Sequence, residues 1–395
     1  MTPRRLLAPV PLATFLGEHW GESHLCVRGR AAKYTQLFGW RDLNHLLATQ
    51  RLDAPRLRLV RDARDVLPRN PVVRLRAAGN DPKAAQLNVR ALNRELARDA
   101  TLVLNAVNEM HPPIAELARG FARLFLTEPN VNLYASFGRQ PGYGPHWDDH
   151  DVFILQLAGR KRWLLYGPGR PHPLKRDARP NELQPLKPKA RLLLKAGDLL
   201  YIPRGHWHDA IAVGEPTLHL TLGVATLTGI DFLNWLADNV RSVESARRDI
   251  PLFDATARGA WLARVTSAAR ARLGPEGLLQ YLEERRAVLQ SSAPPALPYS
   301  VHPQFVPAAN DGVRWTGAAH AAPARSAAGI TVRTLDHEYV FDLEAAPLIE
   351  RLLQGKTIRY GALRRSFARK LGPRRFQRFM SELLREHFIT LVPAR

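Results

Sequence analysis

Cysteine is almost absent from this sequence of 395 residues, in which Cys26 is the only one. A single thiol excludes an internal disulfide framework and any cysteine-rich zinc site. Long apolar runs are also missing, because Pro9 and Pro11 interrupt the stretch that follows the two N-terminal arginines, and eighteen uninterrupted apolar residues occur nowhere. These absences argue against a signal peptide and a membrane span, so we expect a cytoplasmic protein with no membrane contact.

Lysine and acidic residues are scarce relative to arginine. Only nine of the 57 basic residues are lysines, and 36 acidic residues leave a net charge of +21. Such a surface attracts polyanions, nucleic acid above all, although a GC-rich genome also enriches arginine. With 45% hydrophobic residues the chain is globular, and its length predicts two or three domains.

The first 227 residues are expected to form one domain, mainly β with some helix. Apolar residues recur every three or four positions up to about residue 52, which indicates short amphipathic helices. Between residues 130 and 225, short apolar runs alternate with glycine and proline, as in "DVFILQLAG", "KRWLLYGP" and "TLHLTLGVA". Several short strands at this spacing predict a β-sandwich or barrel.

The remainder predicts three smaller parts. Residues 228–290 are helical in pattern, and residues 291–330 form an Ala/Pro/Ser-rich linker. Residues 331–395 combine strands with three short helices, an arrangement that resembles a winged helix, and carry thirteen basic against seven acidic residues. That charge would suit nucleic acid, but the solvated face of a packed helix is the favoured interpretation of "PRRFQR".

One short stretch, "GPHWDDHDVFILQLAG", clusters imidazoles and carboxylates before an apolar run. On a strand, His146 and Asp148 would point to the same side. About 60 residues later, "GDLLYIPRGHWH" matches the spacing of the second cupin motif, which favours His208 over His206 as a third ligand. Two histidines and one carboxylate with open positions are typical of non-haem Fe(II) oxygenases, although Mn, Ni or Zn fit the same ligands. A solvated surface cluster is the alternative.

The other polar residues of these two stretches are expected around the metal rather than on it. Asp149 and Asp151 would face away from it, and His150 would lie farther along the same face. We expect these three at the rim or supporting the ligands, and His206 at the mouth. The acidic pair would then guide a cationic substrate side chain.

With these motifs in view, the sequence resembles the JmjC-type, cupin-4 group of 2-oxoglutarate oxygenases that hydroxylate ribosomal proteins. "HWDDHDVFILQLAGRKRWLLY", "AGDLLYIPRGHWHDA" and "TLHLTLGV" carry the resemblance, and "FLGEHWGESHLCVRGR" and the later helical segments extend it over nearly the whole chain. It implies a double-stranded β-helix core (the cupin/JmjC jelly roll), followed by a helical segment and a winged-helix-like domain. It also implies Fe(II), 2-oxoglutarate and O2 as cofactor and cosubstrates, and a homodimer formed through residues 228–290.

The same resemblance assigns a cosubstrate pocket. Lys161, fifteen positions after His146, stands where the family has a basic residue for the distal carboxylate of 2-oxoglutarate; a strand-edge surface lysine is the alternative. Asn132 and Tyr134 match the family's Asn-x-Tyr pair, and Ser136 continues their strand face, although any of them is also plausible as a satisfied core group. Gly223 departs from the pattern, since relatives often have serine there, which suggests a looser pocket or another substrate.

Three functions follow as hypotheses. The first is hydroxylation of an arginine or histidine of a ribosomal protein, since bacterial members of the family act on arginine and animal members on histidine, with transient ribosome or RNA contact. The second is the same iron chemistry on a peptide or small molecule of secondary metabolism. The third is a nucleic-acid-binding protein with a degenerate cupin, against which the intact set of ligands argues.

Overall fold

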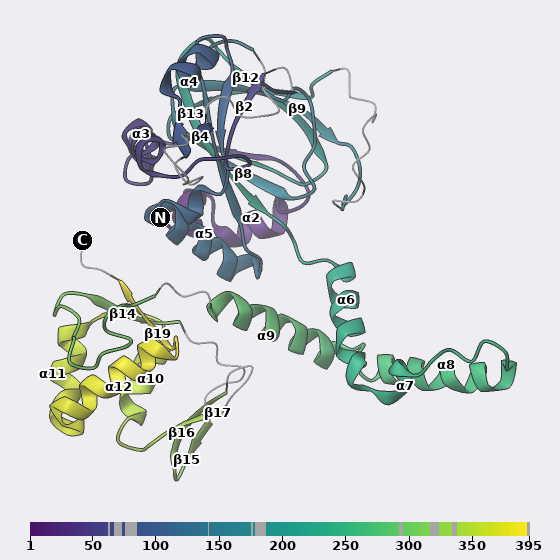
Figure 1. The fold of residues 1–395 in the computed structure, drawn as a ribbon, viewed down its shortest axis with the longest axis vertical. Helices are drawn as coiled ribbons and strands as arrows, with labels where there is room; N and C mark the ends of the chain where they lie inside the picture. Colours follow the sequence, from purple (N-terminus) through teal and green to yellow (C-terminus); the bar gives the residue numbers. More distant parts are fainter. Residues whose placement is uncertain are drawn as a thin grey trace. The chain divides into compact units, whose positions relative to one another are not determined.

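A computed structural model gives the fold, and the chain divides into two compact units, Met1–Thr226 and Leu227–Arg395 (Figure 1). Each unit is described by itself. The residues that the structure describes are 1–61, 64–66, 73–75, 85–140, 142–174, 177, 187–291, 295–316, 324–333 and 338–392.

The first unit begins with helices and ends in consecutive strands. Its helices are α1 (Pro3–Leu7), α2 (Leu12–Glu18), α3 (Trp40–Thr49), α4 (Val89–Leu96) and α5 (Pro112–Phe125), with short 3-10 turns at Ala31–Tyr34 and Val107–Glu109. Its strands are β1 (Leu25–Val27), β2 (Leu57–Arg61), β3 (Arg64–Asp65), β4 (Val73–Leu75), β5 (Ala85–Leu87), β6 (Thr101–Leu104), β7 (Asn130–Ser136), β8 (Asp151–Ala158), β9 (Arg160–Pro168), β10 (Ala190–Lys195), β11 (Leu199–Ile202), β12 (His206–Ala212) and β13 (Thr217–Val224).

Two antiparallel sheets form the centre of this unit. The larger one has the order β1-β11-β8-β13-β7-β6-β2-β3, and the smaller one has the order β10-β9-β12. Strands distant in sequence lie side by side, since β8 pairs with both β11 and β13, and β9 pairs with both β10 and β12. The expected antiparallel β core is therefore present, and it draws on strands from both ends of the unit (Figure 1).

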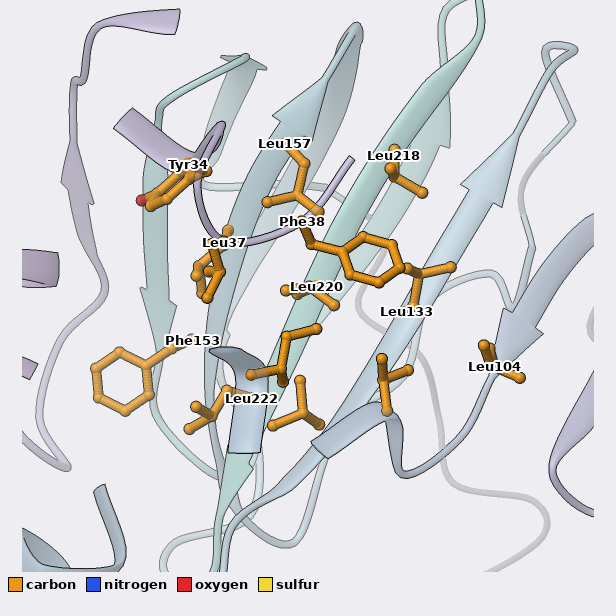
Figure 2. Close-up of a cluster of buried hydrophobic side chains, with 14 of the residues drawn as sticks. Tyr34, Leu37, Phe38, Leu104, Leu133, Phe153, Leu157, Leu218, Leu220 and Leu222 are labelled. Atoms are coloured by element: carbon orange, nitrogen blue, oxygen red, sulfur yellow. The ribbon is translucent and has the colours of Figure 1, made fainter. Parts of the chain in front are cut away.

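Side-chain alternation along the large sheet separates two cores. On β8, Phe153 and Leu155 belong to a core that also contains side chains of α1, α2, α3 and α5, while Val152 and Ile154 join a second core with Trp163 of β9. Figure 2 shows the first of these clusters, with Leu218, Leu220 and Leu222 of β13 along it. Because successive side chains of a strand point to opposite faces, one face of the large sheet packs on helices and the other on the small sheet.

The space between the sheets receives the polar side chains of β7 and β13. Val131, Leu133 and Ala135 of β7 lie in the helix-covered core, so Asn132, Tyr134 and Ser136 point the other way, towards the small sheet. The same alternation on β13 places His219 in that space, because the flanking Leu218 and Leu220 lie in the helix-covered core. Polar groups from both strands thus meet inside the double sheet.

The second unit contains helices and short strands. Its helices are α6 (Gly229–Asn239), α7 (Glu244–Arg247), α8 (Ala255–Arg270), α9 (Pro275–Ser291), α10 (Ala346–Leu353), α11 (Tyr360–Leu371) and α12 (Pro373–Arg385), with a 3-10 turn at Val240–Ser242. Its strands are β14 (Gly312–Trp315), β15 (Ala324–Ser326), β16 (Gly329–Arg333), β17 (Glu338–Phe341), β18 (Ile358–Arg359) and β19 (Ile389–Val392).

Several features of this unit differ from the expected division. β14, inside the expected linker 291–330, pairs with β18 and β19 and belongs to the same sheet as they do. A second sheet has the order β15-β16-β17, and a core around Phe376, Leu348 and Val313 joins strands to the helices α10, α11 and α12. The winged helix and the functional division of residues 228–395 stay predictions. Among the residues that the structure describes, every helix is too short or too polar to span a lipid bilayer.

Candidate metal centre and adjoining anion pocket

His146 and Asp148 lie just before β8, not on a strand. The backbone N–H of His146 donates to the carbonyl of His208 at 3.0 Å, and the N–H of His208 donates back to the carbonyl of His146 at 2.8 Å. Downstream, the N–H of Gly205 donates to the carbonyl of Asp148. The strand alternation invoked from the sequence therefore does not apply to this stretch. An isolated bridge to β12 brings the two residues to His208 instead.

The three side chains converge on one point. Their candidate ligand atoms all lie within 4.8 Å of one another. The closest ion-pair distance among them joins His208 Nε2 to Asp148 Oδ2, at 3.5 Å, and the two imidazole rings have centroids 4.4 Å apart. His208 is 3% exposed, while His146 and Asp148 are partly exposed. The arrangement leaves one side open, as a catalytic metal site requires.

Backbone carbonyls fix the tautomer of both imidazoles. Nδ1 of His146 lies 2.8 Å from the carbonyl oxygen of Gly144, and Nδ1 of His208 lies 3.0 Å from that of His206. A carbonyl only accepts, so each Nδ1 carries the proton and each Nε2 keeps its lone pair. A hydrogen-bonded Nδ1 is the support that metal-binding histidines generally have. Burial and the neighbouring His146 also lower the pKa of His208 to about 4, so it is neutral above that pH. These donors fit a divalent transition metal.

Asp151 has a structural role and does not lie at the rim, which was one of the two positions expected for it. It is 1% exposed, and the hydroxyl of Tyr201 donates to its Oδ1 at 2.5 Å. The Tyr201 oxygen in turn accepts from the backbone N–H of Gly21. This chain of hydrogen bonds ties β8 and β11 to the N-terminal segment, so Asp151 is not available to guide a substrate.

His150 occupies the space beside Gly223. A Cβ at Gly223 would lie 2.6 Å from Cδ2 of His150, which is closer than side-chain atoms approach. Nδ1 of His150 lies 2.8 Å from Oδ1 of Asp149, and although burial opposes its charge, that bond and the nearby carboxylates raise its pKa. The looser pocket expected from Gly223 is therefore not what the structure has, because an imidazole fills the room that glycine leaves.

His206 lies beside the ligands without joining them. Its ring is partly buried, and burial together with the nearby His24 and Lys189 lowers its pKa. Its contribution to the centre is its carbonyl, which accepts from His208.

Lys161 is buried between the sheets. It lies on β9, is 3% exposed, and among the described residues its ammonium group has one hydrogen bond, a long one of 3.4 Å to Oγ of Ser136. Burial lowers its pKa from 10.5 to about 8, an effect that Asp209 partly opposes without forming an ion pair. The alternative of a surface lysine is excluded by this burial. A buried cation that forms no ion pair among the described residues marks a place for an anion.

The three residues expected to line the pocket share one face of β7. Ser136 is 3% exposed and its hydroxyl also lies 3.0 Å from that of Thr101. Asn132 accepts from the backbone N–H of Ala106 at 3.2 Å, so part of its hydrogen-bonding capacity is used structurally. Burial raises the pKa of Tyr134, which keeps its phenol protonated and able to donate. Their positions are compatible with a pocket that begins at Lys161.

Two aromatic residues of the same space were not singled out from the sequence. The ring of His219 on β13 stacks on that of Tyr134, with centroids 4.8 Å apart and planes 7° apart. Trp163 on β9 approaches the rings of both His219 and His208, with centroid distances of 5.7 and 6.0 Å. The alternation in "TLHLTLGV" is the signal that identifies His219 as an inward-facing residue.

Comparison with known proteins identifies a domain that contains the candidate metal centre and the anion pocket. The JmjC domain model matches residues 109–232, which include all three candidate ligands and Lys161. Ribosomal oxygenase 2 of Rattus norvegicus is 28% identical over 258 residues, which are 62% of this chain and 52% of that protein. Ribosomal oxygenase 1 of Homo sapiens is 33% identical over 229 residues, 55% of this chain and 33% of that protein. The matched region thus spans between a third and a half of these relatives.

Solved structures extend the likeness to both units. The ribosomal oxygenase YcfD of Escherichia coli covers 97% of this chain with 98% of its own, at a TM-score of 0.58 and 19% identity. A YcfD structure in complex with cobalt and 2-oxoglutarate gives a TM-score of 0.59 at the same identity. At this identity the likeness concerns the fold, and it confirms the cupin/JmjC architecture expected from the sequence. Residues 109–232 therefore match the JmjC domain, and the chain has the fold of the ribosomal oxygenase YcfD.

Proposed function

We propose that this protein is an Fe(II)- and 2-oxoglutarate-dependent oxygenase that hydroxylates an arginine or histidine side chain of a ribosomal protein. The observation that carries the proposal is the convergence of the candidate ligand atoms of His146, Asp148 and His208 within 4.8 Å of one another, together with a buried Lys161 that forms no ion pair among the described residues. A facial set of three ligands leaves positions for a bidentate cosubstrate and for O2. The third hypothesis, a degenerate cupin, has no support in a site this complete.

Each residue has a defined task in this proposal. His146 and His208 offer Nε2 and Asp148 offers a carboxylate oxygen, and the backbone bridge between the two histidines holds them in register. Lys161 pairs with the distal carboxylate of 2-oxoglutarate, with Ser136 beside it. The bound iron would couple decarboxylation of 2-oxoglutarate to oxidation of a substrate C–H bond. The two surrounding sheets exclude water from that reaction.

The substrate class comes from the relatives. Two of the relatives and YcfD are named ribosomal oxygenases, and the insect proteins similar to this chain are named bifunctional lysine-specific demethylase and histidyl-hydroxylase. A ribosomal protein substrate would place the enzyme in the cytoplasm. Ribosomal proteins are basic, and Asp149, with 29% of its side chain exposed, offers a carboxylate near the site for a cationic side chain.

A decisive experiment compares ribosomal proteins from cells with and without this protein by mass spectrometry. The proposal predicts one peptide heavier by a single oxygen atom only where the protein is present, and the same change when the purified enzyme receives Fe(II), 2-oxoglutarate and O2. Succinate formation without any modified ribosomal protein would redirect the search to the alternative of a peptide or small-molecule substrate.

We propose a homodimer through residues 228–290. Large apolar side chains are exposed along this segment: Ile230, Leu233, Ile250, Leu252, Phe253, Leu262, Leu273, Leu278 and Leu279, with Phe253 100% exposed. A soluble unit rarely exposes so many without a partner. Light scattering after size exclusion tests this proposal. Leu262→Glu should shift the protein towards monomer and the neighbouring Arg264→Gln should not, whereas a wild-type monomer contradicts it.

We also propose that α11 contacts RNA during the encounter with the ribosome. Arg365, Arg369 and Lys370 are exposed on it and have no ion pair among the described residues. Arg365 and Arg369 are four positions apart, where like charges destabilise a helix. Replacing both by glutamine should weaken binding to a structured RNA and flatten its salt dependence. The substitution Arg375→Gln serves as control, because Arg375 already pairs with Asp342. Equal RNA binding by both variants would mean that these arginines are only a solvated face.

A further inference from the structure

The space beside Lys161 contains more unused hydrogen-bonding groups than the proposed function has assigned. His219 is 2% exposed, and its Nδ1 is buried without a hydrogen-bond partner among the described residues. Nε1 of Trp163 is likewise buried without an acceptor in this part of the chain. Buried polar groups in native proteins nearly always have partners, and leaving one unpaired costs about 1–3 kcal/mol. These two groups and Lys161 can each donate to an acceptor that the described residues do not supply, since Asp209, whose Oδ1 is also buried without a hydrogen-bond partner, forms no ion pair with Lys161.

The ring of His219 is held in a fixed orientation. Tyr134, its direct neighbour across β7 and β13, stacks flat on one face of the imidazole. Trp163 meets the ring nearly perpendicularly, with an interplanar angle of 83°. Such a clamp restricts rotation of the ring, so its nitrogens keep their direction whether or not a ligand is bound.

The charge state of His219 suits a donor role. Burial, and then the nearby positive charge of Lys161, lower its pKa well below 6.5, so the imidazole is neutral and carries one N–H. A neutral donor adds a contact to an anion without placing a second positive charge next to Lys161, which this dry space would make costly. His219 is also not part of the group that converges on the metal position.

We propose that His219 is a cosubstrate-binding residue, whose imidazole N–H donates a hydrogen bond to the dicarboxylate that Lys161 pairs with. The inference rests on the proposed function, because that function supplies the anion. The alternative is a purely structural role, in which the ring serves only as a stacking partner for Tyr134. The two differ in what happens when the ring is kept and the nitrogens are removed.

The test measures binding without turnover. 2-Oxoglutarate is titrated calorimetrically into the full chain loaded with Mn(II) in place of iron, for wild type and for His219→Phe, which keeps an aromatic ring and lacks the N–H. Hydrogen bonds to a charged group predict that the dissociation constant rises by about tenfold or more. Mn(II) affinity should stay unchanged, since His219 is not a metal ligand. Unchanged 2-oxoglutarate affinity in a folded His219→Phe variant would overturn the proposal.

A second pair of variants covers the case in which phenylalanine does not fit. His219→Gln and His219→Met have similar size and flexibility, but only glutamine donates. The proposal predicts that the glutamine variant binds 2-oxoglutarate more tightly than the methionine variant by about fivefold or more, at equal melting temperatures. Equal affinities would mean that the nitrogens are not used. Failure of the wild-type protein itself to bind 2-oxoglutarate would instead remove the proposed function along with this inference.

Discussion

The two halves of the site between the sheets are built differently. In the metal half, both imidazoles have their Nδ1 atoms bound to backbone carbonyls at 2.8 and 3.0 Å, and two backbone hydrogen bonds join His146 to His208. In the anion half, Lys161 has one bond of 3.4 Å, and Nδ1 of His219 and Nε1 of Trp163 have none among the described residues. The first half is complete before any ligand arrives, and the second half is completed by its ligand.

This difference shows which interactions stabilise each half of the site. The metal half is supported by protein contacts, so the ligands keep their geometry in the free protein. The anion half holds a buried ammonium group that the fold alone does not satisfy, and the protein carries that cost until a carboxylate binds. Substitutions in the two halves should therefore differ in their effect on stability and resemble each other in their effect on activity.

The largest effect is expected from Asp148→Ala. Loss of a direct ligand should reduce metal affinity and succinate formation by more than about 100-fold. Mutation of a residue that only hydrogen-bonds to a ligand typically costs up to about 100-fold. The melting temperature should change little, since 28% of the Asp148 side chain is exposed. Asp149→Ala is a matched control, as Asp149 is adjacent and 29% exposed, and it should retain metal binding. Equal metal affinities of the two variants would refute the ligand assignment.

The second largest effect is expected from Lys161→Met, which should weaken 2-oxoglutarate binding while stabilising the ligand-free protein. Removal of the cation should weaken 2-oxoglutarate binding by about 100-fold or more, as when a buried pair loses one partner. The ligand-free protein should at the same time gain unfolding free energy at neutral pH, by about 3 kcal/mol for a pKa lowered from 10.5 to about 8. Calorimetry and chemical denaturation measure the two quantities, and Lys195→Met, at an exposed lysine of β10, should change neither.

The pH dependences of 2-oxoglutarate affinity and of protein stability test the same difference between the two halves. Because the Lys161 ammonium is half neutralised at about pH 8, 2-oxoglutarate affinity should fall above that pH by up to about tenfold per unit. Stability of the ligand-free protein should move the other way: between about pH 8 and 10.5 the unfolded chain binds more protons at this lysine, so unfolding free energy rises with pH. Both slopes should vanish in Lys161→Met. Slopes that persist in that variant would assign them to other groups.

The smallest effect is expected from Ser136→Ala. Among the residues that the structure describes, its hydroxyl has the long bond to Lys161 and a bond of 3.0 Å to Thr101. Loss of one neutral hydrogen bond predicts a decrease in 2-oxoglutarate affinity of about two- to fivefold. A loss as large as that of Lys161→Met would mean that Ser136 binds the ligand directly and strongly.

The sequence predicted features that depend on local periodicity. Alternation on β7 and β13 predicts which side chains face inward, and the two spaced motifs led to His146, Asp148 and His208. The helix α8 lies within residues 228–290, which were expected to be helical, although none of its side chains is buried. β14 was assigned to a linker because four residues paired with two remote strands leave no local signal.

The missed details of the site have the same cause. His146 reaches its place through an isolated bridge to β12, and a contact between segments 62 positions apart has no trace in the spacing of neighbouring residues. The burial of Asp151 against Tyr201 depends on a partner 50 residues away. Charge near a metal motif suggested a rim position for Asp151, while packing decided otherwise.

Because Gly223 and His150 approach each other closely, substitutions at these two positions should be coupled. The imidazole occupies the volume that a side chain on β13 would need, so a serine at 223 requires a smaller or rotated residue at 150. We expect Gly223→Ser to be disruptive alone and tolerated together with His150→Ala, which a double-mutant cycle would measure. Homologues should then vary at both positions or at neither, which makes the pair a marker for a distinct subgroup.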